Sequence, residues 1–322
     1  MKRILLGLLA AVVLLVGAGA LYQAAATAAD ARSYAAPGEM VDVGGYRLHL
    51  YCLGEQEPGA PTVILENGLG STSAAWARVQ PEVAKSARVC AYDRAGTGWS
   101  DGGPAPRDAQ SLAGELHSLL RAAGVPGPYV LVGWSFGGLV AQVFSGQYPD
   151  EVAGLVLVDS SHPEQWRSSA ASKAQYESLG RLLAAVPWLA RIGLMRVMGL
   201  FAPDPGLPPP YGQALKGAYA ATKDLDTQAA EFAAWEAASA QVHDSPLRGD
   251  LPLYVLTATE HDTLPDEEQN WQALQSELAR LSTNSVHQVV HGADHADFWR
   301  DPQTARLTVA AILQIVQAPA TP

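Results

Sequence analysis

Six short and mostly apolar runs divide the chain into segments of roughly helical length. They occupy residues 62–65, 88–92, 129–132, 155–158, 253–257 and 285–290. A strand whose successive side chains are apolar is covered on both faces, as in a parallel sheet that lies between two layers of helices. The pattern therefore predicts an α/β fold with a mostly parallel sheet flanked by helices.

Two further strands are expected before these runs. Residues 39–43, followed by Gly44 and Gly45, are typical of a strand and a tight turn. From residue 46 to residue 52, apolar and more polar side chains alternate, which is the pattern of a half-buried antiparallel strand. Two strands here and six from the apolar runs predict an eight-stranded sheet.

The spacing of the runs is broken once. About 90 residues separate the run at 155–158 from the run at 253–257, which is too long for a simple connection between strands. The intervening chain contains helical stretches around 175–200 and 213–242, and we interpret it as a helical cap over the sheet. The predicted organisation is an N-terminal segment and linker at 1–36, a core domain formed by 37–159 and 251–322, and a cap insertion at 160–250.

The N-terminal segment is expected to target the chain to a membrane. Lys2 and Arg3 precede an uncharged apolar run at 4–21, which as a helix of about 18 residues would extend about 27 Å and nearly span a bilayer. The positive-inside rule keeps the two basic residues in the cytoplasm and predicts an anchored, extracytoplasmic protein. The alternative is a signal peptide cleaved near 26–28, which would leave a secreted or periplasmic protein.

Charge and cysteine content exclude several classes of partner. The chain has 21 basic and 32 acidic residues and a net charge of −11, so it would repel nucleic acid on average, and a neutral or cationic small molecule fits better. Its only two cysteines, Cys52 and Cys90, form no C-x-x-C motif and no cluster with histidine. No metal site is predicted.

The strongest chemical signal follows the run at 129–132. It is the segment Gly133-Trp134-Ser135-Phe136-Gly137-Gly138, which opens an apolar helix. A serine on so tight a turn between strand and helix needs small neighbours, because the backbone is strained and a side chain would collide there. The motif predicts Ser135 as a nucleophile held at the carboxyl end of the sheet, over the positive end of the next helix.

With this motif in its context, the chain resembles the α/β-hydrolase superfamily over about residues 40–317. The segments at 91–100 and 148–159 are similar to stretches around the fourth and sixth strands of that family. The branch it resembles most is that of the capped serine esterases and proline-iminopeptidase-like enzymes. The resemblance implies a catalytic triad in the chain order nucleophile, acid, base.

The resemblance places the base and the acid after the last two strands. Of eight histidines, His295 follows the last strand where the family has its base, and His291 is the competitor. The acid is expected on the turn after the run at 253–257, where Asp262 is our choice. Asp159, used at the equivalent position by some relatives, and Glu260 are the alternatives.

Two backbone amides are expected to stabilise the oxyanion of the tetrahedral intermediate. One is the amide of Phe136, just after the nucleophile. The other is the amide of Leu69 in the segment 66–70, where this chain lacks the His-Gly pair common in the family.

The family's strand order also implies that Cys52 and Cys90 meet on antiparallel strands, either as a disulfide or as two buried thiols. The segment at 91–100 also contains four residues that could be taken for a functional motif. We assign them to structure instead, as a buried turn with its own polar contacts: Asp93, Arg94, Gly98 and Ser100.

These inferences predict a serine hydrolase that cleaves carboxylic esters of small or lipophilic substrates through an acyl-enzyme, without cofactor or metal. A first alternative is an aminopeptidase acting on N-terminal proline. It would need a cap carboxylate to bind the substrate amine, and the candidates are Glu164, Asp224, Asp226, Glu231 and Glu236. A second alternative is a catalytically silent binding protein with the same fold.

Overall fold

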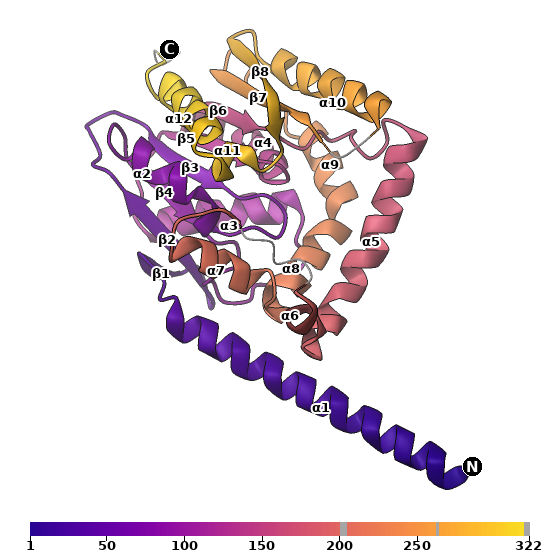
Figure 1. The fold of residues 1–322 in the computed structure, drawn as a ribbon. Helices are drawn as coiled ribbons and strands as arrows, with labels where there is room; N and C mark the ends of the chain where they lie inside the picture. The colour runs from indigo at the N-terminus through magenta and orange to yellow at the C-terminus, as the bar shows by residue number, and fades with distance from the viewer. Residues whose placement is uncertain (200–204, 262–263, 319–322) are drawn as a thin grey trace.

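A computed structural model of the chain describes residues 1–199, 205–261 and 264–318. Its centre is one eight-stranded sheet with the strand order β1-β2-β4-β3-β5-β6-β7-β8, and the predicted sheet is confirmed (Figure 1). The strands are β1 (Glu39–Asp42), β2 (Arg47–Leu53), β3 (Thr62–Glu66), β4 (Val89–Tyr92), β5 (Tyr129–Trp134), β6 (Val152–Val158), β7 (Leu253–Glu260) and β8 (Ser285–Asp294).

Pairing within the sheet follows the patterns in the sequence. The alternating strand β2 pairs antiparallel with β1 and with β4, and every other pair is parallel. All residues of β3, β4 and β5 are buried, as their continuous apolar character requires. Cys52 of β2 lies opposite Cys90 of β4, and their sulfur atoms form a disulfide between residues 38 positions apart.

Helices cover both faces of the sheet and bury two apolar clusters. Ile64 of β3 points into one cluster, and its neighbours Val63 and Leu65 point into the other. The first cluster includes residues of α3 (Ala109–Ala122) and α4 (Gly137–Gln147), and the second includes residues of α2 (Gln80–Val83), α11 (Asp297–Arg300) and α12 (Pro302–Val316). Helix α10 (Pro265–Leu278) connects β7 to β8. Because parallel strands all end at one edge, the loops that follow β3, β5, β6, β7 and β8 meet there.

The long segment between β6 and β7 folds into helices that pack beside the sheet (Figure 1). They are α5 (Ala170–Arg191), α6 (Leu194–Met198), α7 (Tyr211–Ala218), α8 (Thr222–Ala233) and α9 (Trp235–His243). Aromatic rings join this cap to the core. The ring of Trp235 lies 4.9 Å from that of Phe136, the residue after Ser135, and 5.7 Å from that of Phe232.

The N-terminal helix α1 (Lys2–Ser33) is longer than the apolar run that predicts it. It is long and apolar enough to cross a membrane. Its first half projects away from the body of the protein (Figure 1), with the side chains exposed. Its second half contacts the cap, where the side chain of Gln23 is buried.

Candidate active site

Ser135 lies on the turn between β5 and α4 in a strained backbone conformation. Its φ is 54°, and among the described residues only Ser135 and Asp159 combine a positive φ with a side chain. A conformation of this kind costs on the order of 1–3 kcal/mol. The flanking glycines are required by space, because a Cβ at Gly133 would lie 2.6 Å from the Cα of Gly138, and one at Gly137 would lie 2.5 Å from the carbonyl oxygen of Asn67.

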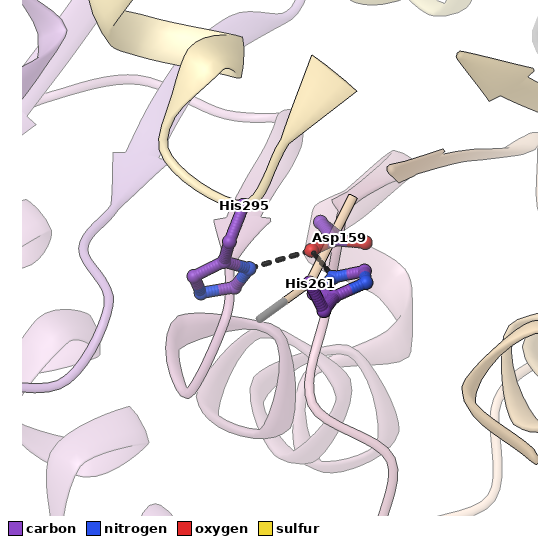
Figure 2. Close-up of side chains that lie close together, drawn as sticks. All are labelled: Asp159, His261 and His295. Atoms are coloured by element: carbon purple, nitrogen blue, oxygen red, sulfur yellow. Dashed lines mark hydrogen bonds and ion pairs between the residues drawn. The ribbon is translucent and has the colours of Figure 1, made fainter. Parts of the chain in front are cut away.

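His295 follows β8, and its ring binds the carboxylate of Asp159 at the end of β6 (Figure 2). The Nδ1 of His295 lies 2.5 Å from Oδ2 of Asp159. The other carboxylate oxygen, Oδ1, accepts hydrogen bonds from the amide of Ala258 at 3.0 Å and from Nε1 of Trp271 at 3.1 Å. Burial alone would raise the pKa of Asp159, but hydrogen bonds from His261 and His295 outweigh it and hold the pKa well below its usual range.

The structure therefore joins His295 to Asp159, which the sequence offered as an alternative acid. Asp262, our first choice, lies outside the described residues. Glu260 is exposed on the last position of β7. His291 is exposed on β8, and no partner is recorded for its ring among the described residues. Of the two histidines considered as the base, His295 is the one with a buried carboxylate at its Nδ1.

A second histidine, His261, binds the same carboxylate. Its Nε2 lies 2.9 Å from Oδ2 of Asp159, and its Nδ1 lies 2.8 Å from Oε2 of Glu268. Burial by itself would lower the pKa of His261, but these two carboxylates raise it to about 9. Both ring nitrogens then donate protons, so His261 is a cation at neutral pH. The sequence did not identify this role, and the only available signal was the position of His261 at the carboxyl end of β7.

Asp159, His261 and His295 also form a group that could ligate a metal ion, because one ligand atom of each lies within 4.8 Å of the others. In the structure these same atoms are joined by hydrogen bonds, with Oδ2 of Asp159 accepting from both rings. A cation would have to displace two ring protons and the pairing that they maintain. The contacts favour a proton-transfer site over a metal site.

A cavity of about 810 Å³ connects these groups to the cap. Ser135, His295 and Leu69 lie on its wall. Aromatic and aliphatic side chains from the cap and from α10 form much of the remainder: Trp166, Leu179, Phe232, Trp235, Trp271 and Leu274. Among the described residues, the amides of Leu69 and Phe136 donate to no backbone carbonyl in the loops and turns. Phe136 directly follows Ser135, and Leu69 lies on the cavity wall.

Comparison with known protein families identifies the family of the fold. The profile of the alpha/beta hydrolase fold matches residues 61–302, which include the serine turn, the cap and the histidine loop. The chain belongs to the α/β-hydrolase fold family. The resemblance inferred from the sequence motifs is confirmed at the level of the superfamily.

The relatives of this chain align with different fractions of its sequence. An uncharacterized protein of Schizosaccharomyces pombe is 27% identical over 87% of this chain and 56% of its own length. An uncharacterized vacuolar membrane protein of Saccharomyces cerevisiae is 34% identical over 37% of this chain and 21% of its own length. The chain thus spans about half or less of these curated relatives. A thermophilic esterase from Thermogutta terrifontis has a similar fold, with a TM-score of 0.62 and 21% identity over 87% of this chain and 99% of the esterase chain.

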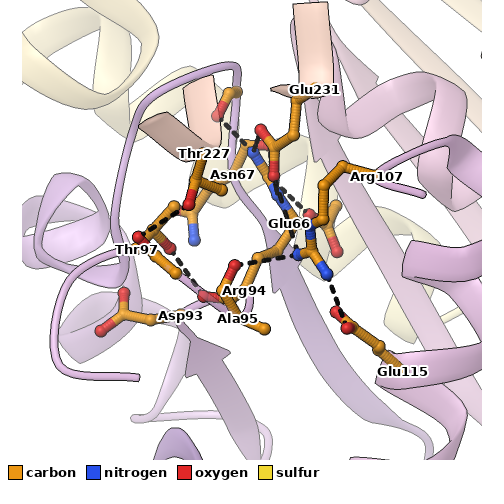
Figure 3. A network of polar contacts seen from close by, with 12 residues as sticks. Glu66, Asn67, Asp93, Arg94, Ala95, Thr97, Arg107, Glu115, Thr227 and Glu231 are labelled. Carbon is orange, nitrogen blue, oxygen red and sulfur yellow. Dashed lines mark hydrogen bonds and ion pairs between the residues drawn. The ribbon is translucent and has the colours of Figure 1, made fainter. Parts of the chain in front are cut away.

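The buried guanidinium of Arg94 holds the loop that carries Leu69 (Figure 3). It donates to the carbonyl oxygens of Asn67 at 2.6 Å and Gly68 at 2.9 Å, and to Oε1 of Glu66 at 2.7 Å. From the cap side, both carboxylate oxygens of Glu231 on α8 accept from Arg94 at 2.8 Å. Arg94 therefore links the loop after β3 to the cap.

The turn at residues 91–100 is held by polar contacts of its own and also connects to neighbouring segments. Asp93 accepts hydrogen bonds from the amides of Ser73 at 2.7 Å and Trp99 at 3.0 Å, and the hydroxyl of Ser100 donates to the carbonyl of Asp93. The bonds from Trp99 and Ser100 lie within the turn, and the bond from Ser73 ties it to the segment after β3. Arg94 binds both the loop after β3 and the cap, so it positions the loop beside Ser135 and the cap together.

We expect Glu231→Ala to lower the free energy of unfolding by about 3–5 kcal/mol, because it leaves the charge of Arg94 buried without its cap partner. Urea denaturation of the purified chain measures the change. Glu236→Ala, five positions along and exposed, is the matched control and should change stability by less than about 0.5 kcal/mol. Equal stability of the two variants would show that Glu231 does not hold the cap to the core.

Proposed function

We propose that this chain is a serine hydrolase that cleaves carboxylic esters through a covalent acyl-enzyme. Ser135 is the nucleophile, His295 the general base and Asp159 the carboxylate that orients the base. The observation that carries the proposal is the bond between Nδ1 of His295 and the buried Asp159, on the wall of the cavity that Ser135 also lines. Asp159 takes the place that the sequence favoured for Asp262.

The steps follow from these groups. The Oγ of Ser135 attacks the carbonyl carbon while Nε2 of His295 removes the hydroxyl proton, and Asp159 stabilises the imidazolium that forms. The negative charge on the carbonyl oxygen is stabilised by the amides of Leu69 and Phe136, which donate to no loop or turn carbonyl in the described part of the chain. The base then protonates the leaving alkoxide, and water cleaves the acyl-enzyme by the same route in reverse.

The cavity favours a neutral substrate with an apolar acyl or alcohol group. Its cap wall is rich in aromatic side chains. Among the charged groups on the wall, three carboxylates outnumber two cations, Arg300 and His261, and Arg300 is paired with Asp294. Together with a net charge of −11, this excess of acidic groups disfavours anionic esters. An esterase is among the proteins with a similar fold.

The aminopeptidase alternative receives less support from the cap. None of the five carboxylates considered for binding the amine lines this cavity. Glu231 is paired with Arg94, Asp226 with Arg191, and Glu164 with His243. Asp224 is buried and accepts from the amide of Gly98. An ester is therefore the favoured substrate.

Active-site labelling tests the proposal. The full-length chain is treated with a fluorophosphonate probe, and the modified peptide is located by mass spectrometry. We expect labelling at Ser135, together with turnover of short-chain aryl esters at least a hundredfold faster than that of proline amides. Absence of labelling would favour a silent binding protein, and preferential cleavage of proline amides would favour the aminopeptidase.

We also propose that α1 is an uncleaved membrane anchor, with Lys2 and Arg3 in the cytoplasm and the rest of the chain outside it. The contacts of α1 with the cap lie on both sides of the possible cleavage site at 26–28, since Gln23 and Asp30 both bind Arg196. Cleavage there would remove the contact of Gln23. The related vacuolar membrane protein of yeast supports membrane association. Intact mass measurement of the membrane-extracted chain tests the anchor, and a mass that lacks the first residues would exclude it.

The pH profile is expected to depend on His261. His261→Gln removes a fixed positive charge whose ring centroid lies 6.2 Å from that of His295. Without this charge the imidazole of His295 takes up a proton more easily. The acid limb of the kcat/KM profile should therefore move to higher pH by about one unit. Because folding raises the pKa of His261 to about 9, its stabilising contribution is complete below pH 6.5 and is lost as the pH rises through 9.

Two variants separate this effect from loss of structure. Trp271→Phe removes a neutral hydrogen bond to the same carboxylate and should leave the acid limb in place. Glu268→Gln removes a negative charge beside His261 while His261 remains protonated at the acid limb. It should therefore move the limb in the opposite direction by a smaller amount. A uniform loss of kcat in His261→Gln, with no displacement of the limb, would show that the charge has no catalytic influence.

A further inference from the structure

The N-terminal helix touches the cap through two glycines. A Cβ at Gly19 of α1 would lie 2.1 Å from the carbonyl oxygen of Ile192, and a Cβ at Gly193 would lie 2.7 Å from the carbonyl oxygen of Gly19. Gly193 also has a φ of +71°, which it uses to begin α6 directly after α5. The backbone of α1 at Gly19 thus meets the backbone of the turn between α5 and α6 directly, and the ring of Tyr22 lies beside this contact.

Polar contacts fix the orientation of α1 beyond this point. The guanidinium of Arg196 on α6 binds Oε1 of Gln23 at 3.1 Å and Oδ2 of Asp30 at 2.7 Å. Gln23 is buried and donates to the carbonyl oxygen of Ala220 in the cap at 2.8 Å. Contacts at Gly19, Gln23 and Asp30 span about three turns of helix. They prevent α1 from swinging freely relative to the cap.

Three apolar side chains are exposed next to the contact of Gly19 with Gly193. Trp188 near the end of α5 is 69% exposed, and Val197 and Met198 on α6 are 72% and 57% exposed. We name these three residues the cap corner. The guanidinium of Arg191 lies 4.9 Å from the centre of the Trp188 ring. Both carboxylate oxygens of Asp226 accept from the same guanidinium, so the charge of Arg191 is paired. The surface of the corner therefore combines an indole with the apolar side chains of a valine and a methionine.

We propose that the cap corner lies in the headgroup region of the bilayer that α1 spans. The inference rests on the proposed anchoring by α1. The apolar run at 4–21 ends where Gly19 meets Gly193, so the outer boundary of the bilayer coincides with the turn that bears the corner. Tryptophan is characteristic of this interface, because the indole is apolar over most of its surface and carries one polar N–H group.

A bilayer fits these residues better than a second copy of the chain. The three side chains form a small group and lack the broad, closely packed area that a stable dimer needs. Their position is continuous with the exposed apolar half of α1, and that half requires a lipid environment of its own. Contact at the corner would hold the cap, and with it the aromatic wall of the cavity, at a fixed height above the membrane.

Site-specific fluorescence tests the proposal on the full chain. Both native cysteines are in the disulfide, so an introduced cysteine can be labelled selectively with an environment-sensitive fluorophore. Val197→Cys reports the corner, Leu14→Cys reports the apolar half of α1, and Val286→Cys on β8, 38% exposed, is the matched control. Each labelled chain is reconstituted in phosphatidylcholine vesicles with and without a nitroxide lipid.

We expect quenching at positions 14 and 197 to exceed that at position 286 by at least threefold. Quenching at 14 with none at 197 would overturn the corner contact and leave the anchor intact. Absence of quenching at both would overturn the anchor and the corner together. Efficient oxidative crosslinking of unlabelled Val197→Cys chains to each other, without quenching at 197, would identify a second copy as the occupant and also reject the proposal.

Discussion

Replacing Ser135 with alanine is expected to lower kcat on an aryl ester by about 10⁵- to 10⁶-fold, while KM changes little. Without the hydroxyl no acyl-enzyme forms, and His295 has no proton to transfer. The cavity and the two oxyanion amides remain, so a small residual rate from substrate binding is expected. Initial rates over a range of ester concentrations give both constants.

Two controls accompany the Ser135 variant. Ser145→Ala makes the same substitution on the following helix, where the hydroxyl only donates to Ala141 of its own helix, and it should leave kcat unchanged. The thermal unfolding temperature of Ser135→Ala should not fall, because alanine at φ 54° is no more strained than serine. If the ester is turned over at the original rate by folded Ser135→Ala, covalent catalysis at this residue is excluded.

The turn that carries Ser135 and the sheet were predictable because their causes are local. Continuous apolar runs require burial on both faces, and the turn around Ser135 requires glycine at 133 and 137 for reasons of space. The partners of Asp159 and Arg94 depend on the folded chain instead. Asp159 is 102 positions from His261 and 136 from His295, and Arg94 is 137 from Glu231. No periodicity or spacing in the sequence encodes such pairs.

The choice of acid shows this limit most clearly. The carboxyl ends of β6 and β7 are adjacent in the sheet, so an aspartate after either strand can reach a histidine from the loop after β8. The resemblance to the family favoured the later position, on the turn after β7. The position of the Asp159 side chain also depends on its own backbone conformation. Asp159 has a positive φ of 40° directly after β6. A φ value of this kind has no reliable sequence signal outside glycine.

The docking of α1 was also beyond the sequence. The alanine-rich stretch after residue 21 has little apolar pattern, and the predicted membrane segment ends there. In the structure the same stretch continues as helix to Ser33 and binds the cap through Gln23 and Asp30. A polar side chain that is buried by a partner about 200 positions away looks in the sequence like any exposed glutamine.

The second large effect is expected for the acid. Asp159→Asn should lower kcat by about 10⁴-fold, because an amide can no longer fix the tautomer of His295 or stabilise its imidazolium. KM should change little, since Asp159 is fully buried and does not line the cavity. The loss should exceed that of Trp271→Phe, which removes one neutral donor to the same carboxylate. Kinetics on the same ester at neutral pH measure all variants.

Asp262→Asn is the decisive comparison, because it makes the same change at the residue that the resemblance to the family favours. If Asp159 supplies the carboxylate, Asp262→Asn should keep kcat within about threefold of the original value, since the Nδ1 of His295 is already bound. The reverse result, with Asp262→Asn losing about 10⁴-fold and Asp159→Asn remaining active, would assign the acid to β7. Asp159 with His261 and Glu268 would then be a structural ion-pair network beside the triad.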